Sequence, residues 1–167
     1  LELTLGMIRD FDIRVRQEGS TWSFKGRARG HDQTAEIDLS GGGALLSALV
    51  ISGRTGLLQG WNHATVQAEG FLPEELSRSG LDLEFTDDGL VYQPGPFDGL
   101  MIDTKSCPDA VPALAVMALK ARTASRFENA TYLKGKDSDR LGALLDYAER
   151  TGVDMKLDGE TLLVSPG

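Results

Sequence analysis

The sequence predicts an α/β (α+β) fold built from repeated βαβαββ units, in which helices pack on small sheets. Three observations support this prediction. The composition, 41% hydrophobic and 25% charged residues, is typical of a globular chain that can bury a core. The segment 36–56 resembles the segment 101–124, and the segment 76–89 resembles 147–159. A repeat of this length indicates one supersecondary unit that is used more than once.

The opening residues match only the second half of such a unit. Residues 3–10 are expected to form the end of a helix, and two strands are expected at 13–15 and 22–24. A turn at 18–20 connects the strands. We therefore expect the chain to begin inside a unit and to be part of a longer polypeptide. The alternative is a small protein whose first unit is degenerate.

The middle of the chain fits a complete unit. It begins with a strand at 36–38, continues with an apolar helical run at 44–51, and has a second helix that ends at Gly80. Asp88-Gly89, between two short apolar runs, indicates a hairpin turn. The small residues at 40–43 precede the apolar run. They would let a phosphate approach the start of the helix closely, or would form an ordinary tight turn.

The last part of the chain fits a second complete unit. A strand at 101–103 precedes the segment 108–121, which is apolar on nearly every side and is expected to be a buried helix. The final helix has an apolar stripe at helical spacing, formed by Leu141, Leu144, Leu145 and Ala148.

The final helix also has start and stop signals. We expect Ser138 or Asp137 to cap its beginning and Gly152 to end it, and Asp158-Gly159 indicates a second hairpin turn. The predicted organisation is therefore the second half of a preceding unit at 1–31, a complete unit at 32–99, and a complete unit at 100–167 that carries the candidate site.

Charge and composition argue against several classes of protein. A net charge of -8 opposes general binding to nucleic acid or to an anionic membrane. No apolar run is long enough for a membrane helix, so we expect a cytoplasmic protein. Cys107 is the only cysteine and cannot form an internal disulfide. His31 and His63 do not have the spacing of metal ligands, and no metal is expected.

Functional groups concentrate in two places of the last unit. Asp109 is expected in the first turn of the buried helix, where the helix dipole would keep it ionised and able to accept a proton or a hydrogen bond. The segment 134–140 interleaves three cations with two carboxylates at a loop-to-helix junction, which could bind an anion. Asp109 could equally be an ordinary first-turn residue, and the segment could be a solvated charge run.

The order and spacing of two segments resemble the 5-enolpyruvylshikimate-3-phosphate synthases. These are Pro108-Asp109-Ala110-Val111-Pro112-Ala113-Leu114-Ala115-Val116-Met117-Ala118 and Leu133-Lys134-Gly135-Lys136-Asp137-Ser138-Asp139-Arg140-Leu141. Residues 3–8 and 38–40 also resemble the family, so the likeness covers essentially the whole chain. The resemblance implies six βαβαββ units in two domains, with this chain mostly from the second domain.

The resemblance also implies a reaction and a set of residue roles. The family transfers the enolpyruvyl group of phosphoenolpyruvate to the 5-hydroxyl of shikimate 3-phosphate, without a metal or an organic cofactor, on the route to chorismate and aromatic amino acids. Asp109 matches a catalytic aspartate that holds the shikimate hydroxyl and is a candidate base. Asp137 matches the acid that moves the methylene proton. Arg140 matches an arginine that grips phosphoenolpyruvate, and Lys136 matches a lysine that contacts the substrates.

Two departures from the family pattern affect the expected activity. The family has Glu where this chain has Asp137, which is shorter by one methylene. The rest of the polypeptide would supply the other phosphate-binding residues, so the fragment alone is expected to be inactive. Two alternatives remain: a non-catalytic binding relative, and a transferase that moves enolpyruvyl to a UDP-amino sugar.

Overall fold

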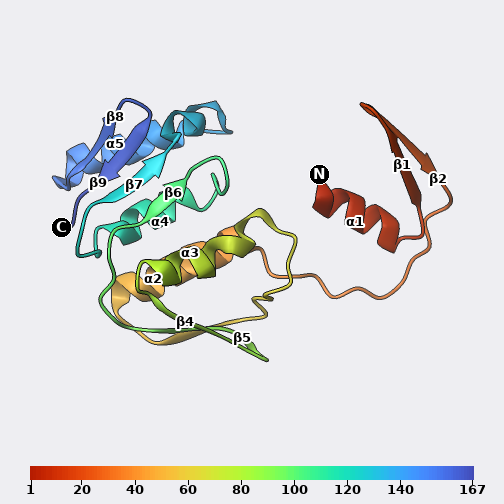
Figure 1. Ribbon diagram of the computed structural model, residues 1–167, viewed down its shortest axis with the longest axis horizontal. Helices are drawn as coiled ribbons and strands as arrows, with labels where there is room; N and C mark the ends of the chain where they lie inside the picture. Colours follow the sequence, from red (N-terminus) through yellow and green to blue (C-terminus); the bar gives the residue numbers. More distant parts are fainter. The chain divides into compact units, whose positions relative to one another are not determined.

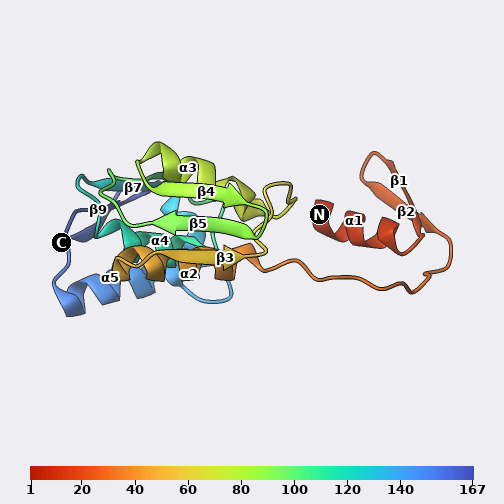
Figure 2. The same cartoon turned by 90° about the horizontal axis from the view of Figure 1, so that it is seen from below.

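The computed structural model describes residues 1–167 and divides into two compact units, Leu1–Glu36 and Ile37–Gly167. Figures 1 and 2 show the helices and strands of each unit. None of the helices combines the length and the apolar character that crossing a membrane requires. The fold is the predicted mixture of helices and small sheets.

The first unit is a helix followed by a hairpin, as the sequence predicts. Helix α1 (Glu2–Asp10) precedes the antiparallel strands β1 (Arg14–Glu18) and β2 (Thr21–Lys25). Glu18 pairs with Thr21 across a tight turn in which Gly19 has a φ of 60°. Glycine adopts this left-handed conformation without a steric penalty, which explains why the turn lies there.

The second unit contains two sheets. The first sheet and its helices comprise α2 (Leu39–Ser52), β3 (Gly56–Gln59), the short 3₁₀ helix η1 (Ala68–Phe71), α3 (Leu72–Arg78), β4 (Asp82–Thr86) and β5 (Gly89–Gln93). Its three strands are antiparallel in the order β3-β5-β4, with β5 in the centre (Figure 2).

The second sheet has four strands. It and its helices comprise β6 (Met101–Asp103), α4 (Val111–Ala118), β7 (Ser125–Glu128), the 3₁₀ helix η2 (Ala130–Gly135), α5 (Arg140–Thr151), β8 (Met155–Asp158) and β9 (Thr161–Val164). The order is β6-β7-β9-β8, and only β6 and β7 are parallel. The sequence repeat is thus a repeat of topology, because β3-β5-β4 reproduces the order of β7-β9-β8.

The strand predicted at 36–38 does not form, so the first sheet lacks a counterpart of β6. The side-chain amide of Gln67 accounts for this difference. Its Nε2 donates to the carbonyl of Ile37 at 2.8 Å, and its Oε1 accepts from the N–H of Leu39 at 2.9 Å. These backbone groups are therefore satisfied by a side chain instead of a neighbouring strand.

Helices α2 and α4 pack against each other in the core of the second unit (Figure 1). The glycines predicted to precede α2 lie inside it, and Gly42 and Gly43 are buried. A Cβ on Gly42 would lie 2.9 Å from the ring of Trp61, which is 1% exposed. These glycines therefore permit close packing, and the tight turn expected before the helix does not form.

The starts of two helices differ from the prediction. Helix α4 begins at Val111, and Asp109 lies in the turn that precedes its N-cap Ala110. The cap of α5 is Asp139, not Ser138 or Asp137. Gly152 does end α5, in the left-handed conformation. Both predicted hairpins form, joining β4 to β5 and β8 to β9.

Candidate active site

Arg140 is the first residue of α5, and its guanidinium reaches the turn before α4. Its Nη1 donates to the carbonyl oxygen of Pro108 at 3.0 Å and to Oδ1 of Asp109. The Arg140 side chain is 19% exposed and that of Asp109 is 52% exposed. One guanidinium therefore joins the beginnings of two helices that lie far apart in the sequence.

The backbone at the start of α5 fixes the position of Arg140. Oδ1 of Asp139 accepts from the N–H of Gly142 at 2.8 Å, which caps the helix. The N–H of Arg140 bonds to the carbonyl of Ser138 at 3.0 Å. A Cβ on Gly142 would lie 2.7 Å from the Asp139 carboxylate, so the small residue leaves room for the cap.

The turn that holds Asp109 rests on a buried residue. The N–H groups of Ala110 and Val111 both bond to the carbonyl of Cys107, which is fully buried. Burial, together with the nearby charges of Glu69 and Asp103, raises the pKa of the Cys107 thiol to about 12. Cys107 is therefore a neutral packed thiol, and it supports Asp109 through its backbone only.

Asp137 lies on the open side of the same arginine. Its Oδ2 is 4.0 Å from Nη2 of Arg140, and its side chain is 98% exposed. An ion pair at this separation and exposure contributes little to stability. The carboxylate therefore lies near the arginine and is accessible to a ligand.

Lys136 makes a different contact. Its Nζ lies 4.6 Å from the centre of the Tyr132 ring, in a cation–π interaction, and no ion pair joins it to a carboxylate. The structure therefore brings Asp109, Asp137 and Arg140 together around one guanidinium. It places Lys136 next to Asp137 in the chain, with its ammonium over Tyr132.

Sequence reasoning missed three contributors to this arrangement. The carbonyl of Pro108 gives no signal in a side-chain pattern. Asp139 was one of three adjacent residues suitable as a cap, and only the structure distinguishes them. Tyr132 lies in the 3₁₀ helix η2, and Lys136 follows that helix in an extended conformation, so no regular spacing in the sequence signals their contact.

The preceding sequence repeat has a corresponding loop at 67–69, also within residues 37–167, and this loop contacts its helix differently. Ser40, at the start of α2, donates its hydroxyl to Oε1 of Glu69 at 3.0 Å, and Glu69 is 6% exposed. Gln67 binds the backbone on either side of Asp38, as described above. This loop offers a neutral amide and a buried carboxylate to its helix. The corresponding loop of the last repeat, which contains Lys136 and Asp137, instead carries cations and an exposed carboxylate.

No group of three or more histidine, cysteine, aspartate or glutamate side chains is placed to hold a metal ion. The side chains that meet at the site are one guanidinium, one ammonium and two carboxylates. Such a set can bind an anion and exchange protons.

The whole sequence, residues 1–167, matches the family EPSP synthase (3-phosphoshikimate 1-carboxyvinyltransferase). The chain belongs to this family. It is 26% identical to the 3-phosphoshikimate 1-carboxyvinyltransferase of Methanoregula boonei, over 99% of this chain and 40% of the relative. It is 30% identical to that of Chlamydia felis, over 99% of this chain and 38% of the relative. The chain thus spans about 40% of the length of these curated relatives.

Solved structures have the same fold as this EPSP synthase family chain. EPSP synthase from Acinetobacter baumannii superposes with a TM-score of 0.78 and 21% identity, over 98% of this chain and 40% of that one. The enolpyruvyl transferase NikO from Streptomyces tendae superposes with a TM-score of 0.71 and 20% identity, over 99% and 40% of the two chains. The fold of this chain is therefore that of EPSP synthase.

Proposed function

We propose that this chain forms part of a cytoplasmic 3-phosphoshikimate 1-carboxyvinyltransferase. The reaction transfers the enolpyruvyl group of phosphoenolpyruvate to the 5-hydroxyl of shikimate 3-phosphate and releases phosphate. The observation that carries the proposal is the convergence of Asp109 and Asp137 on Arg140 in a member of this family.

The geometry suits an addition followed by an elimination. Arg140 uses Nη1 for Pro108 and Asp109, so its other guanidinium N–H groups can donate to the carboxylate or phosphate of phosphoenolpyruvate. The half-exposed Asp109 can accept a hydrogen bond from the shikimate hydroxyl. Asp137, on the open side, carries the proton to and from the methylene carbon.

Lys136 adds a second cation for the two anionic substrates. Its ammonium rests on the Tyr132 ring, which is an exposed and reversible contact. Lysine can leave such a ring at a cost of about 0.5–1 kcal/mol, which is small beside a charge-assisted hydrogen bond to phosphate. The contact keeps the ammonium close to the site, and the ammonium forms no ion pair with a protein carboxylate.

The length of the chain limits what it does alone. It spans about 40% of its curated relatives, so the complete reaction needs groups from elsewhere in the polypeptide. We expect the 167-residue chain to show no turnover and at most weak binding of phosphoenolpyruvate and shikimate 3-phosphate. As the family resemblance implies, we expect the reaction to use no organic cofactor.

The test is the release of inorganic phosphate from phosphoenolpyruvate and shikimate 3-phosphate by the complete polypeptide that contains this chain. The variants are Asp137→Ala and Arg140→Ala, with Arg150→Ala as the control, because Arg150 pairs with Asp146 at the far end of the same helix. We expect release to depend on shikimate 3-phosphate, to fall at least about 100-fold in both site variants, and to persist in the control. A folded complete polypeptide without activity would refute the proposal.

The exposure of Asp137 favours one alternative, a non-catalytic relative that binds the substrates. A carboxylate 4.0 Å from its cation and one methylene shorter than glutamate could be too far from the substrate, and a displacement of about 1 Å can cost about 100-fold in rate. Binding of both substrates without phosphate release would favour this relative. Release of phosphate with a UDP-amino sugar in place of shikimate 3-phosphate would favour the other alternative, a transferase that moves enolpyruvyl to a UDP-amino sugar.

A further inference from the structure

The first unit contains a cleft of about 810 Å³ whose walls carry an excess of positive charge. Five cationic side chains and one carboxylate line it, namely Arg9, Arg14, Lys25, Arg27, Arg29 and Asp12. The whole chain has a net charge of -8, so the positive charge of the cleft is opposite in sign to the charge of the protein as a whole. The cleft belongs to the first unit alone, whereas the four candidate active-site residues all belong to the second.

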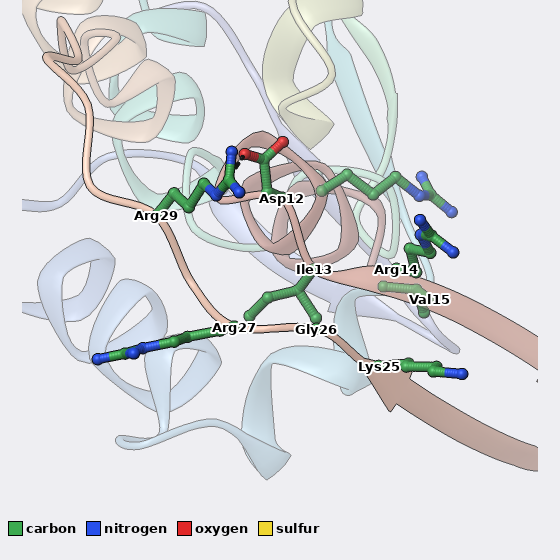
Figure 3. Close-up of a pocket in the computed structure, with 9 residues that line it drawn as sticks. Asp12, Ile13, Arg14, Val15, Lys25, Gly26, Arg27 and Arg29 are labelled. Carbon is green, nitrogen blue, oxygen red and sulfur yellow. Dashed lines mark ion pairs between the residues drawn. The ribbon is translucent and has the colours of Figure 1, made fainter.

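Figure 3 shows how these side chains lie. Arg29 faces Asp12, and their nitrogen and oxygen atoms are 3.9 Å apart. Arg27 points away in the opposite direction from Arg14 and Lys25, which extend to the same side (Figure 3). Arg29 is therefore paired with a carboxylate and Arg27 points away from the others. Arg14 and Lys25 remain as two cations on one side of the cleft.

Arg14 and Lys25 lie directly opposite each other on β1 and β2. Two like charges at opposite positions of an antiparallel pair repel and destabilise the sheet. Arg9, from the last turn of α1, lines the same cleft. None of the ion pairs in the structure involves Arg9, Arg14 or Lys25. The repulsion is therefore not balanced by a protein carboxylate.

The backbone beneath these side chains is tightly constrained. Gly26 follows Lys25 with a φ of 133°, and a Cβ there would lie 3.1 Å from the carbonyl oxygen of Asp12. Asp12 itself has a φ of 62°. The end of β2 thus lies against the turn between α1 and β1, so the backbone that carries Arg14 and Lys25 is fixed beside the end of α1.

We infer that Arg9, Arg14 and Lys25 bind a multiply charged phosphate anion. One carboxylate would neutralise only one of three cations, whereas a phosphate dianion or a phosphorylated small molecule neutralises two and offers three acceptor oxygens. Arg14 can grip two of these oxygens with its planar guanidinium, and Lys25 supplies a point charge. The inference does not depend on the proposed enzymatic function.

The test is a titration of the 15N-labelled 167-residue chain with inorganic phosphate at constant ionic strength, followed by amide chemical shifts. The variants are Arg14→Gln and Lys25→Gln. The matched control is Arg16→Gln, because Arg16 lies on the same strand, pairs with Glu18 at 2.8 Å and does not line the cleft. All three side chains are exposed, and the spectra themselves report whether each variant is folded.

We expect saturable shifts at Arg14 and Gly26, with binding at least about tenfold weaker in the two cleft variants and unchanged in Arg16→Gln. Ribose 5-phosphate serves as a second probe: tighter binding than inorganic phosphate indicates a phosphoryl group on a larger molecule, and equal binding indicates free phosphate. Shifts that do not saturate, an equal loss in Arg16→Gln, or an equal response to acetate would overturn the inference.

Discussion

Nη1 of Arg140 donates hydrogen bonds to the carbonyl oxygen of Pro108 and to Oδ1 of Asp109. The same atom therefore contacts one backbone group and one carboxylate, so the arginine has a structural role as well as its proposed catalytic one. The two roles can be separated, because the backbone contact acts on folding whether or not substrate is present.

Removing this arginine should destabilise the second unit. We expect Arg140→Ala to lower the free energy of unfolding by about 1–3 kcal/mol, because the partly buried carbonyl of Pro108 loses its donor. Arg150→Ala, which breaks an exposed pair in the same helix, should cost at most about 0.5 kcal/mol. Urea unfolding of both variants provides the comparison, and equal losses would refute the structural role of Arg140.

Gly42 should not tolerate a side chain. We expect Gly42→Ala to cost about 1–3 kcal/mol, because the new Cβ would lie 2.9 Å from the buried ring of Trp61. Gly41→Ala in the same helix should be neutral or stabilising by up to about 1 kcal/mol, since its Cβ would meet only the carboxylate of Asp38. Thermal unfolding measures both, and a Gly42→Ala variant as stable as Gly41→Ala would contradict the packing.

The side-chain amide of Gln67 should be required for the stability of the second unit, because it bonds to the backbone before α2. Gln67→Glu removes the donor to Ile37 and places a carboxylate against its carbonyl oxygen, so we expect a loss of about 1–3 kcal/mol. Gln59→Glu makes the same change of charge at an exposed position of β3 and is the control. Urea unfolding measures both variants, and a Gln67→Glu variant as stable as Gln59→Glu would rule out the role of the Gln67 amide.

Cys107 should make the protein less stable in alkali. Its pKa is about 12 in the folded chain against an ordinary value of 9.0, so the unfolded chain loses its thiol proton first and stability falls between pH 9 and 12. The slope from this one group is at most about 1.4 kcal/mol per pH unit.

The measurement for this prediction is urea unfolding of the wild type and Cys107→Ala at several pH values. We expect the variant to have a shallower decline above pH 9. Burial also raises the pKa of Tyr92, but Tyr92 is present in both proteins, so its contribution cancels in the comparison. Identical slopes would show that Cys107 ionises normally.

The sequence predicted the elements that depend on local chemistry. The apolar stripe of α5, with Leu141, Leu144 and Ala148 buried, and its end at Gly152 follow from helical spacing and from the left-handed conformation that glycine allows. The repeat predicted the shared topology of the two sheets. Membership of the family confirmed the resemblance on which the candidate site was based.

The errors arose where distant residues compete with local preference. The segment 36–38 has the pattern of a strand. In the structure, Gln67, some 30 positions later, forms hydrogen bonds with the backbone there in place of a neighbouring strand. Asp137, Ser138 and Asp139 all have side chains that can cap a helix, so local preference could not choose among them. The roles of Asp109, Asp137, Lys136 and Arg140 in catalysis stay predictions until the activity is measured.

Each compact unit contains one tryptophan, Trp22 in β2 and Trp61 beside α2. The fluorescence of each is therefore a local reporter of its own unit. A Trp22→Phe variant would follow only the unfolding of residues 37–167, and a Trp61→Phe variant only that of residues 1–36. Coincident melting curves would show that the two units fold cooperatively, and separate curves would give each unit its own stability.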